Sequence, residues 1–170
     1  HDTDLLIIGG DLLDLFSVSR YDKFSTYFPL SYELTQGKAV INTLASHFKK
    51  IKIIPGNHDE RWKKHLLQKR GLSPFEIESM NMLARMATGD NHVDISDPLY
   101  CLVRDLPNVE LVAPTVKDYA HFGFFHQEGD LIVSHAEKFS RTPNAAAGAA
   151  AFWFQSFALP SGLVKPFKVL

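Results

Sequence analysis

The pattern of apolar positions divides the chain into short strand-like runs and longer segments with helical spacing. Residues 4–8 and 51–54 are mainly apolar runs that stop at glycine or proline, which is typical of buried parallel strands. Between them, residues 12–30 predict a long loop or broken helix, and a helix is expected from Ser31. Strand, helix and strand in succession predict a βαβ unit with a parallel sheet and a right-handed crossover. The apolar positions at helical spacing in that helix are Leu34, Val40, Ile41, Leu44 and Phe48.

Helical signals dominate the stretch that follows the second strand. Ser73, Pro74 and Glu76 form a capping box with proline at the first helical position, which predicts a helix that ends near Gly89. We expect that helix to carry its apolar residues at Ile77, Met80, Leu83 and Met86. The other expected elements are a basic helix at 60–69, a short helix from 97 to 102, strands at 109–113, 119–125, 130–134 and 167–170, a hairpin turn at 127–129, and an alanine-rich core helix at 145–157 in which Gly148 allows close approach of a neighbour.

Length and composition indicate one soluble α/β domain. The 170 residues are 45% hydrophobic and 22% charged, and no linker or repeat divides them, so residues 1–170 form one expected domain with a helical insertion at about 72–106. Cys101 is the only cysteine, which excludes an internal disulfide and thiolate zinc sites and favours a cytoplasmic location. The longest apolar stretch, 145–159, is too short to span a bilayer, so no membrane partner is expected.

Polar residues gather where the first two predicted strands end. Asp11 follows the first strand, and Asn57, His58 and Asp59 follow the second. Because neighbouring parallel strands end at the same edge of a sheet, we expect these side chains to meet there. The alternative is an ordinary strand-to-helix loop, in which Asn57 or Asp59 only caps the next helix.

Three blocks of the chain resemble the calcineurin-like metallophosphoesterases of bacterial and phage type. The family order is D-x-H, G-D-x-x-D, G-N-H-D/E, a single His and G-H-x-H. The chain matches the three central blocks with GDLLD at 10–14, GNHD at 56–59 and His135 after a strand. The resemblance implies an α/β fold, a four-layer α-β-β-α sandwich that is incomplete at both ends here. It also implies hydrolysis of a phosphate mono- or diester by a water activated on two divalent metal ions.

The resemblance implies a metal site built from oxygen and imidazole ligands. Asp11 would bridge two ions, and Asn57 and His135 would bind one of them through an amide oxygen and a ring nitrogen. Such ligands suit Mn, Fe or Zn, and Mn is favoured. An ion pair of this kind lowers the pKa of a bound water and clamps phosphoryl oxygens during displacement.

The resemblance also implies roles in catalysis and substrate binding. His58 would act as an acid for the leaving oxygen or stabilise charge, and Asp59 would orient the His58 ring. Arg61 and Arg20 are candidates for binding the substrate phosphate. Asp14 is expected to cap or brace its loop, or to help orient a ligand.

Two motifs of the family do not occur in the chain. No D-x-H block precedes Asp11, and no G-H-x-H block occurs anywhere. We therefore expect an internal segment of a metallophosphoesterase that is inactive when isolated. The alternative function is a non-catalytic interaction scaffold with an incomplete metal site. A net charge of -1 does not indicate nucleic acid as the substrate, and the sequence leaves the oligomeric state open.

Overall fold

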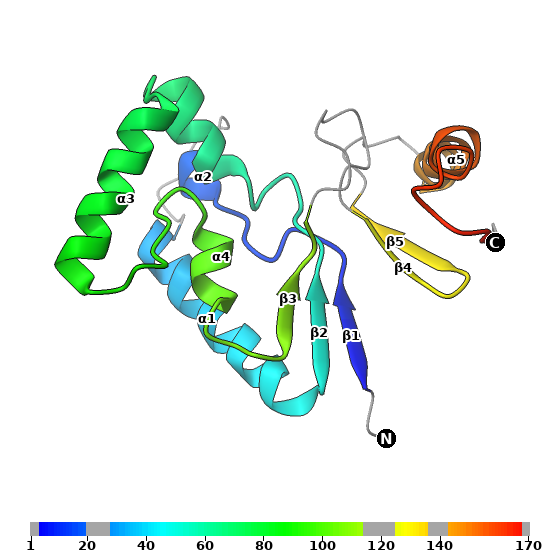
Figure 1. The fold of residues 1–170 in the computed structure, drawn as a ribbon, viewed down its shortest axis with the longest axis horizontal. Coiled ribbons are helices and arrows are strands. Elements are labelled where there is room, and N and C mark those ends of the chain that lie inside the picture. The colour runs from blue at the N-terminus through cyan, green and yellow to red at the C-terminus, as the bar shows by residue number, and fades with distance from the viewer. Residues whose placement is uncertain (1–3, 20–27, 114–124, 136–142, 168–170) are drawn as a thin grey trace.

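A three-stranded parallel sheet forms the centre of the larger part of the molecule (Figure 1). The computed structural model describes residues 4–19, 28–113, 125–135 and 143–167. The strands are β1 (Leu5–Ile8), β2 (Lys50–Ile53) and β3 (Val109–Leu111), in the order β1-β2-β3. Leu5 pairs with Lys50 and Ile51 with Val109, both in parallel register. The predicted βαβ unit and the α/β class are therefore confirmed.

Helices α1 (Leu30–His47) and α4 (Pro98–Val103) pack with the sheet to form the main core. Gly37 lets α1 come close to its neighbours, because a Cβ there would lie 2.8 Å from the Leu13 side chain and 3.2 Å from that of Leu102. Of the apolar positions expected on α1, Ile41 is fully buried but Val40 is 49% exposed. The buried residues of this core are Leu13, Leu15, Ile41, Ile51, Ile53, Leu99, Leu102 and Val103.

The chain between β2 and β3 is helical. Helix α2 (Arg61–Lys64) continues as a π-helical turn at His65–Lys69, followed by α3 (Pro74–Thr88) and then α4. The predicted capping box at Ser73 and Glu76 is present, and Gly89 ends α3 in the left-handed conformation. The four apolar residues expected on this helix do lie in α3, but only Ile77 is buried, whereas Met80, Leu83 and Met86 are 42%, 66% and 75% exposed.

Polar contacts explain why α3 needs few buried apolar residues. The side chain of Asn81, which is 3% exposed, accepts from the backbone N–H of Ile95 and donates to Asp94 (2.8 and 3.1 Å). Arg85 donates to the carbonyl oxygen of Val93 (3.0 Å). These bonds tie α3 to the loop before α4 without covering its outer apolar side.

A hairpin and a helix form a second, smaller core. Strands β4 (Phe125–Glu128) and β5 (Leu131–Ser134) are antiparallel, and α5 (Pro143–Trp153) leads into a π-helical turn at Phe154–Ala158. The rings of Phe125 and Phe154 meet edge to face with centroids 5.2 Å apart. The buried residues of this core are Phe125, Phe154, Ala158 and Val164.

Two expectations for this second part, the turn at 127–129 and the close approach at Gly148, are corrected by the structure. The expected strands at 119–125 and 167–170 lie mostly outside the described residues. Gln127 and Glu128 lie in β4 rather than in a turn, and the chain reverses at Gly129, whose φ of 57° suits a tight turn. Gly148 gives no close approach, since a Cβ there would meet no atom of the described residues within 4 Å.

We call β1–β3, α1–α4 and the loops that join them the sheet unit, and the described residues 125–135 and 143–167 the hairpin unit. Figure 1 shows the β4–β5 hairpin beyond the carboxyl end of β1, on the side of the sheet where β1 is the edge strand. No helix among the described residues is both long and apolar enough to cross a membrane.

Candidate metal centre

Two glycines let three chain segments meet at the carboxyl end of the sheet. Gly10 follows β1 with a φ of 100°, and a Cβ at this position would clash with the ring of His135. Gly56 follows β2, and a Cβ there would clash with the carboxylate and backbone of Asp11. Both motif glycines therefore leave space for residues predicted to bind metal.

The loop after β1 alternates core contacts with residues that face the site. Leu13 and Leu15 are 1% and 0% exposed, whereas the side chain of Asp14 is 57% exposed. Asp11 and Leu15 have φ values of 54° and 50°, a conformation that L-residues other than Asn and Asp seldom adopt. The backbone N–H of Leu15 donates to Glu33 on α1 (2.6 Å), which holds the end of the loop.

Asp59 joins the two loops that carry the site. One of its carboxylate oxygens accepts from the backbone N–H of Leu13, and the other accepts from that of Gly56, each at 2.8 Å. The residue is only 5% exposed, and burial raises the pKa of the Asp59 carboxyl, with a smaller contribution from the nearby charge of Asp11. The two N–H donors act in the opposite direction. Asp59 is thus a buried acceptor between the β1 loop and the β2 loop.

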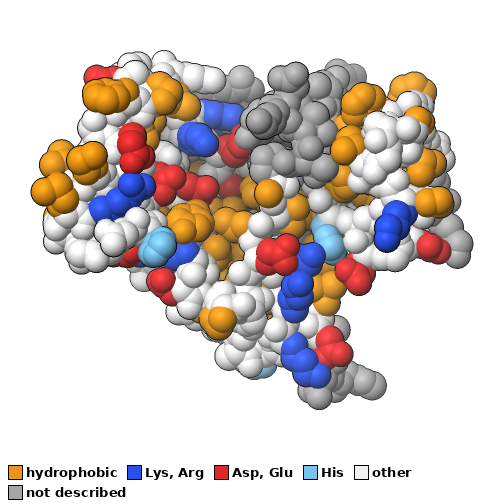
Figure 2. Space-filling model, viewed as in Figure 1, with side chains coloured by type: hydrophobic (Ala, Val, Ile, Leu, Met, Phe, Trp, Pro, Cys, Tyr) orange, Lys and Arg blue, Asp and Glu red, His pale blue; other side chains and the backbone are white. Residues whose placement is uncertain are grey.

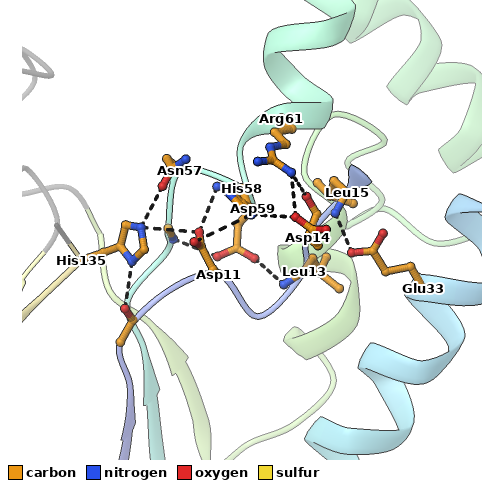
Figure 3. A network of polar contacts seen from close by, with 12 residues as sticks. Asp11, Leu13, Asp14, Leu15, Glu33, Asn57, His58, Asp59, Arg61 and His135 are labelled. Atoms are coloured by element: carbon orange, nitrogen blue, oxygen red, sulfur yellow. Dashed lines mark hydrogen bonds and ion pairs between the residues drawn. The ribbon is translucent and has the colours of Figure 1, made fainter. Parts of the chain in front are cut away.

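Asp11, Asn57 and His135 come together as predicted, from three different strand ends (Figure 3). The Nε2 atom of His135 lies 2.9 Å from Oδ1 of Asn57 and 3.5 Å from Oδ1 of Asp11. On the other side of the ring, Nδ1 lies 3.0 Å from the carbonyl oxygen of Gly9. Gly9 O and Asn57 Oδ1 both only accept, so either ring nitrogen can donate in its own contact; binding of a cation by Nε2 requires the tautomer with the proton on Nδ1, which the Gly9 carbonyl can accept.

This arrangement brings three acceptor atoms face to face, which fits a cation. When two ligand atoms each lie about 2.0–2.2 Å from one ion, the distance between them depends on the ligand–ion–ligand angle. It is about 3 Å for a right angle and about 3.5 Å for the tetrahedral angle. The distances from His135 Nε2 to the Asn57 and Asp11 oxygens fall at these values. The Gly9 carbonyl lies at Nδ1, on the opposite side of the ring from Asn57, which is a common position for the hydrogen-bond partner of a metal-binding histidine.

The ligand set is small and includes an amide. Among the described residues, no group of three or more His, Cys, Asp or Glu side chains could hold a metal ion. Asn57 is the third residue beside Asp11 and His135, so the described residues offer one candidate set of three ligands. They contain no comparable second group of carboxylates and imidazoles for the second ion that the resemblance implies.

His58 lies beside these ligands and is held by an acid other than the expected one. Its Nδ1 is 2.7 Å from Oδ1 of Asp14 and 3.8 Å from Oδ2 of Asp11, and its backbone N–H donates to Asp11 (3.0 Å). The expectation that Asp59 orients the His58 ring does not match this geometry, because both Asp59 oxygens accept from backbone N–H groups. Asp14 takes that position instead.

Arg61 reaches the same acid from the first turn of α2. Its Nη1 donates to the side-chain and the backbone oxygens of Asp14, each at 2.7 Å. The guanidinium therefore lies within the site, 16% exposed, and it braces the residue that holds His58. Arg20 lies outside the described residues.

The role of Asp14 is the functional feature that sequence reasoning places least well. The sequence predicts that Asp14 caps or braces its loop or orients a ligand, and the available signal is its place as the second acid of the GDLLD block.

Comparisons of the chain with protein-family models, curated proteins and solved structures found no significant match.

Proposed function

We propose that the chain carries the catalytic centre of a metal-dependent phosphoesterase of the calcineurin-like type. The observation that carries this proposal is the meeting of Asp11, Asn57 and His135 as three acceptors around one point. The His58–Asp14 contact lies directly beside them. The proposed reaction is hydrolysis of a phosphate mono- or diester.

Asp11, Asn57 and His135 would hold a divalent ion, with Mn favoured because the ligands are oxygens and an imidazole. A bound ion would supply a water of lowered pKa and positive charge for the phosphoryl oxygens. The chain itself supplies rigidity around the ligands. Gly9 holds the His135 ring and the N–H of His58 holds the Asp11 carboxylate, so both face the same point before any ion binds.

His58 is the proposed proton donor for the leaving oxygen. The contact with Asp14 keeps a proton on Nδ1, and this directs Nε2, the opposite ring atom, to donate or accept at the substrate. Arg61 fixes Asp14 through two hydrogen bonds, and its remaining guanidinium N–H groups are available for a phosphate oxygen.

The four-layer sandwich belongs to this proposal as well. The three-stranded sheet with α1 and α4 on one face would form one half, and the β4–β5 hairpin with α5 would begin the other half. A second ion, which the family resemblance implies, would need ligands such as those of a D-x-H motif before Asp11 and of a G-H-x-H motif, and the chain has neither.

The test separates metal binding from turnover. Mn²⁺ affinity of the 170-residue chain is measured by electron paramagnetic resonance for the unchanged protein and for Asp11→Asn, His135→Ala and His58→Ala. Asp11→Asn and His135→Ala each alter a direct ligand. Each should weaken Mn²⁺ binding by more than about 10–100-fold, the loss that is typical when a residue behind a ligand is removed. His58→Ala should keep the affinity, and His47→Ala, at the exposed end of α1, is the matched control.

Turnover of bis-p-nitrophenyl phosphate and p-nitrophenyl phosphate is assayed in the chain and in any longer protein that contains it. His58→Ala should lower kcat by about 10²–10⁴-fold, the usual contribution of a general acid. Unchanged turnover in His58→Ala or Asp11→Asn would contradict the proposal.

A non-catalytic scaffold is the second candidate, and the missing D-x-H and G-H-x-H motifs favour it. A scaffold should show no turnover in any protein that contains the segment, and no loss of Mn²⁺ binding specific to Asp11 or His135. Mn²⁺ affinity and turnover of the two phosphate esters therefore distinguish the phosphoesterase from the scaffold.

A further inference from the structure

The outer side of α3 carries a row of apolar side chains that the described chain leaves exposed. Met82, Leu83 and Met86 are 57%, 66% and 75% exposed, and Phe75 in the first turn is 80% exposed. Residues three, four or seven positions apart share one side of a helix, so these four side chains form one continuous surface, which we call the α3 stripe. In Figure 2, hydrophobic side chains lie along the left edge of the molecule, where Figure 1 places α3.

The inner side of α3 explains how the helix is held without the stripe. Ile77 and Asn81 are its two buried residues, and they lie four positions apart on the side opposite the stripe. Asn81 and Arg85 bind the loop before α4. The α3 stripe therefore takes no part in anchoring the helix and is available to another molecule. Apolar patches of this kind on a folded surface commonly mark an interaction site.

The spacing within the stripe suits a second α3 helix. Phe75, Ser79, Met82 and Met86 follow one another at steps of four, three and four residues, the interval pattern of helices that pack side by side. A two-fold axis near the middle of this row would place Phe75 of one copy opposite Met86 of the other. The same axis would place the small Ser79 opposite the long Met82. A thioether against an aromatic ring is a favourable contact of about 0.3–1.5 kcal/mol.

The charges beside the stripe favour an antiparallel pair. Glu78 and Arg85 lie on the same edge of the stripe, and Oε1 of Glu78 is 2.8 Å from Nη1 of Arg85. A two-fold axis across the helices brings this edge of both copies together in opposite directions, so Glu78 of one copy comes near Arg85 of the other. A parallel pair would instead bring Glu78 of one copy near Glu76 of the other. The charge pattern of α3 is thus complementary to its own antiparallel copy.

A lipid surface fits the α3 stripe less well than a protein helix does. Helices that lie in a membrane interface are rich in lysine and arginine beside their apolar side. The charged residues of α3 are Glu76, Glu78 and Arg85, so acidic side chains outnumber basic ones on this helix. An anionic membrane surface would attract Arg85 but repel both glutamates. The charges therefore favour a second copy of the chain as the occupant.

The size of the stripe predicts a reversible interface. At about 25 cal/mol per Å², the 1.5–3 kcal/mol gained by one fully buried side chain corresponds to roughly 60–120 Å². At their exposed fractions, the four side chains of the stripe offer roughly 200–300 Å² on each copy. An antiparallel pair would bury roughly twice that apolar area, with Glu78 and Arg85 at its rim, which is the size of a transient interface. We expect a dissociation constant of about 10 µM to 1 mM.

We infer that the α3 stripe is an interface at which two copies of this chain pair through antiparallel α3 helices. The stripe forms the apolar centre of the interface, and Glu78 and Arg85 form ion pairs between the copies along its edge. This inference does not depend on the proposed phosphoesterase activity, because α3 carries none of the candidate ligands Asp11, Asn57 and His135.

The test is sedimentation equilibrium of the 170-residue chain at about 10 µM to 1 mM, after a chelating resin has removed metal ions that could bridge two copies. We expect a monomer–dimer equilibrium. Met86→Lys should weaken it by at least about tenfold, because the change places a charge in the apolar centre. Val40→Lys, at an exposed apolar position of α1, is the matched control and should leave the dissociation constant unchanged. Phe152→Lys applies the same change to the exposed apolar side of α5.

A charge exchange between chains tests the antiparallel pairing. Glu78→Arg or Arg85→Glu alone places like charges against each other in the homodimer. An equimolar mixture of the two variants restores opposite charges only between chains, so the mixture should dimerise at least about fivefold more tightly than either variant alone. Circular dichroism checks that both variants keep their helices. If Arg85→Glu does not fold, the comparison of Met86→Lys with Val40→Lys decides the inference.

Three results would overturn the inference. The first is a chain that stays monomeric at about 1 mM. The second is a dissociation constant that is unchanged in folded Met86→Lys, or that rises only in Phe152→Lys, which would place the contact on α5. The third is a monomeric chain that binds vesicles of equal parts phosphatidylcholine and phosphatidylglycerol through the stripe, which would assign the stripe to a lipid surface.

Discussion

The sheet unit and the hairpin unit both reach the candidate metal centre, but they contribute to it in different ways. The sheet unit buries eight core residues and carries Asp11, Asp14, Asn57 and His58 on two loops that share hydrogen bonds. The hairpin unit buries four core residues, among them Phe125 and Phe154, whose rings meet edge to face. It contributes only His135 to the candidate metal centre. One unit builds most of the site, and the other completes it.

This difference teaches where the geometry of the site comes from. Within the sheet unit, buried hydrogen bonds such as that from Leu13 to Asp59 set the positions of the loops without an ion. The hairpin unit reaches these loops through the ring of His135, which contacts Gly9, Asn57 and Asp11. The backbone of Gly9 also runs close to β5, since a Cβ on this glycine would lie 3.8 Å from the Val133 side chain. A bound ion would therefore strengthen the junction between the units more than either unit alone.

The largest effect is expected from breaking the sheet unit at Asp59. Asp59→Ala leaves the backbone N–H groups of Leu13 and Gly56 buried without their acceptor. At about 1–3 kcal/mol for each such group, the free energy of unfolding should fall by about 2–6 kcal/mol. Urea denaturation of the metal-free chain measures this loss.

The control for Asp59→Ala is Asp4→Ala, since Asp4 is an exposed partner of Lys49. That change should cost less than about 1 kcal/mol. Equal losses in the two variants would show that Asp59 does not hold the two loops together.

The next effect concerns the junction between the units. Mn²⁺ at about 100 times its dissociation constant should raise the free energy of unfolding by about 2.7 kcal/mol, because the proposed ligands come together only in the folded chain. In His135→Ala the same Mn²⁺ concentration should stabilise much less, since the hairpin unit no longer supplies a ligand. Denaturation curves with and without Mn²⁺ decide this. Equal stabilisation of both proteins would place the ion elsewhere.

Glycine substitutions test close approach in the two units. Gly56→Ala should lower the free energy of unfolding by about 1–3 kcal/mol and weaken Mn²⁺ binding, because its Cβ would displace Asp11. Gly148→Ala on α5 is the matched substitution, and it should raise stability by about 0.5–1 kcal/mol in an open helical position. A destabilised Gly148→Ala would mean that α5 packs closely at this point.

The smallest expected effect is the pH dependence that Asp59 contributes. Burial raises the pKa of the Asp59 carboxyl in the folded chain above its ordinary value of 3.8. The folded state therefore binds the proton more tightly than the unfolded state does, and the stability due to Asp59 falls as pH rises through that window. The difference in unfolding free energy between the unchanged protein and Asp59→Asn should thus increase as the pH is lowered from about 7 towards about 4. A difference that shrinks on acidification would mean that the carboxylate is stabilised by its N–H donors more than it is penalised by burial.

Local signals predict most of the fold. The capping box at Ser73, the glycine that ends α3 and the proline at the start of α4 can be recognised because caps depend on residues a few positions apart. The exposed side of α3 cannot be recognised in this way. Helical spacing shows which residues share a face, but it does not show that Asn81 and Arg85 hold the helix by polar contacts.

The sequence by itself determined that Asp11 and Asn57 meet. Two parallel strands with one helix between them end at the same edge, so the residues that follow them must be neighbours. Only the tertiary structure decided how the side chains pair there. Asp59 accepts from two backbone N–H groups, and Asp14 contacts the His58 ring. These pairings depend on side-chain directions and on contacts between segments far apart in the chain, and no pattern of neighbouring residues specifies either.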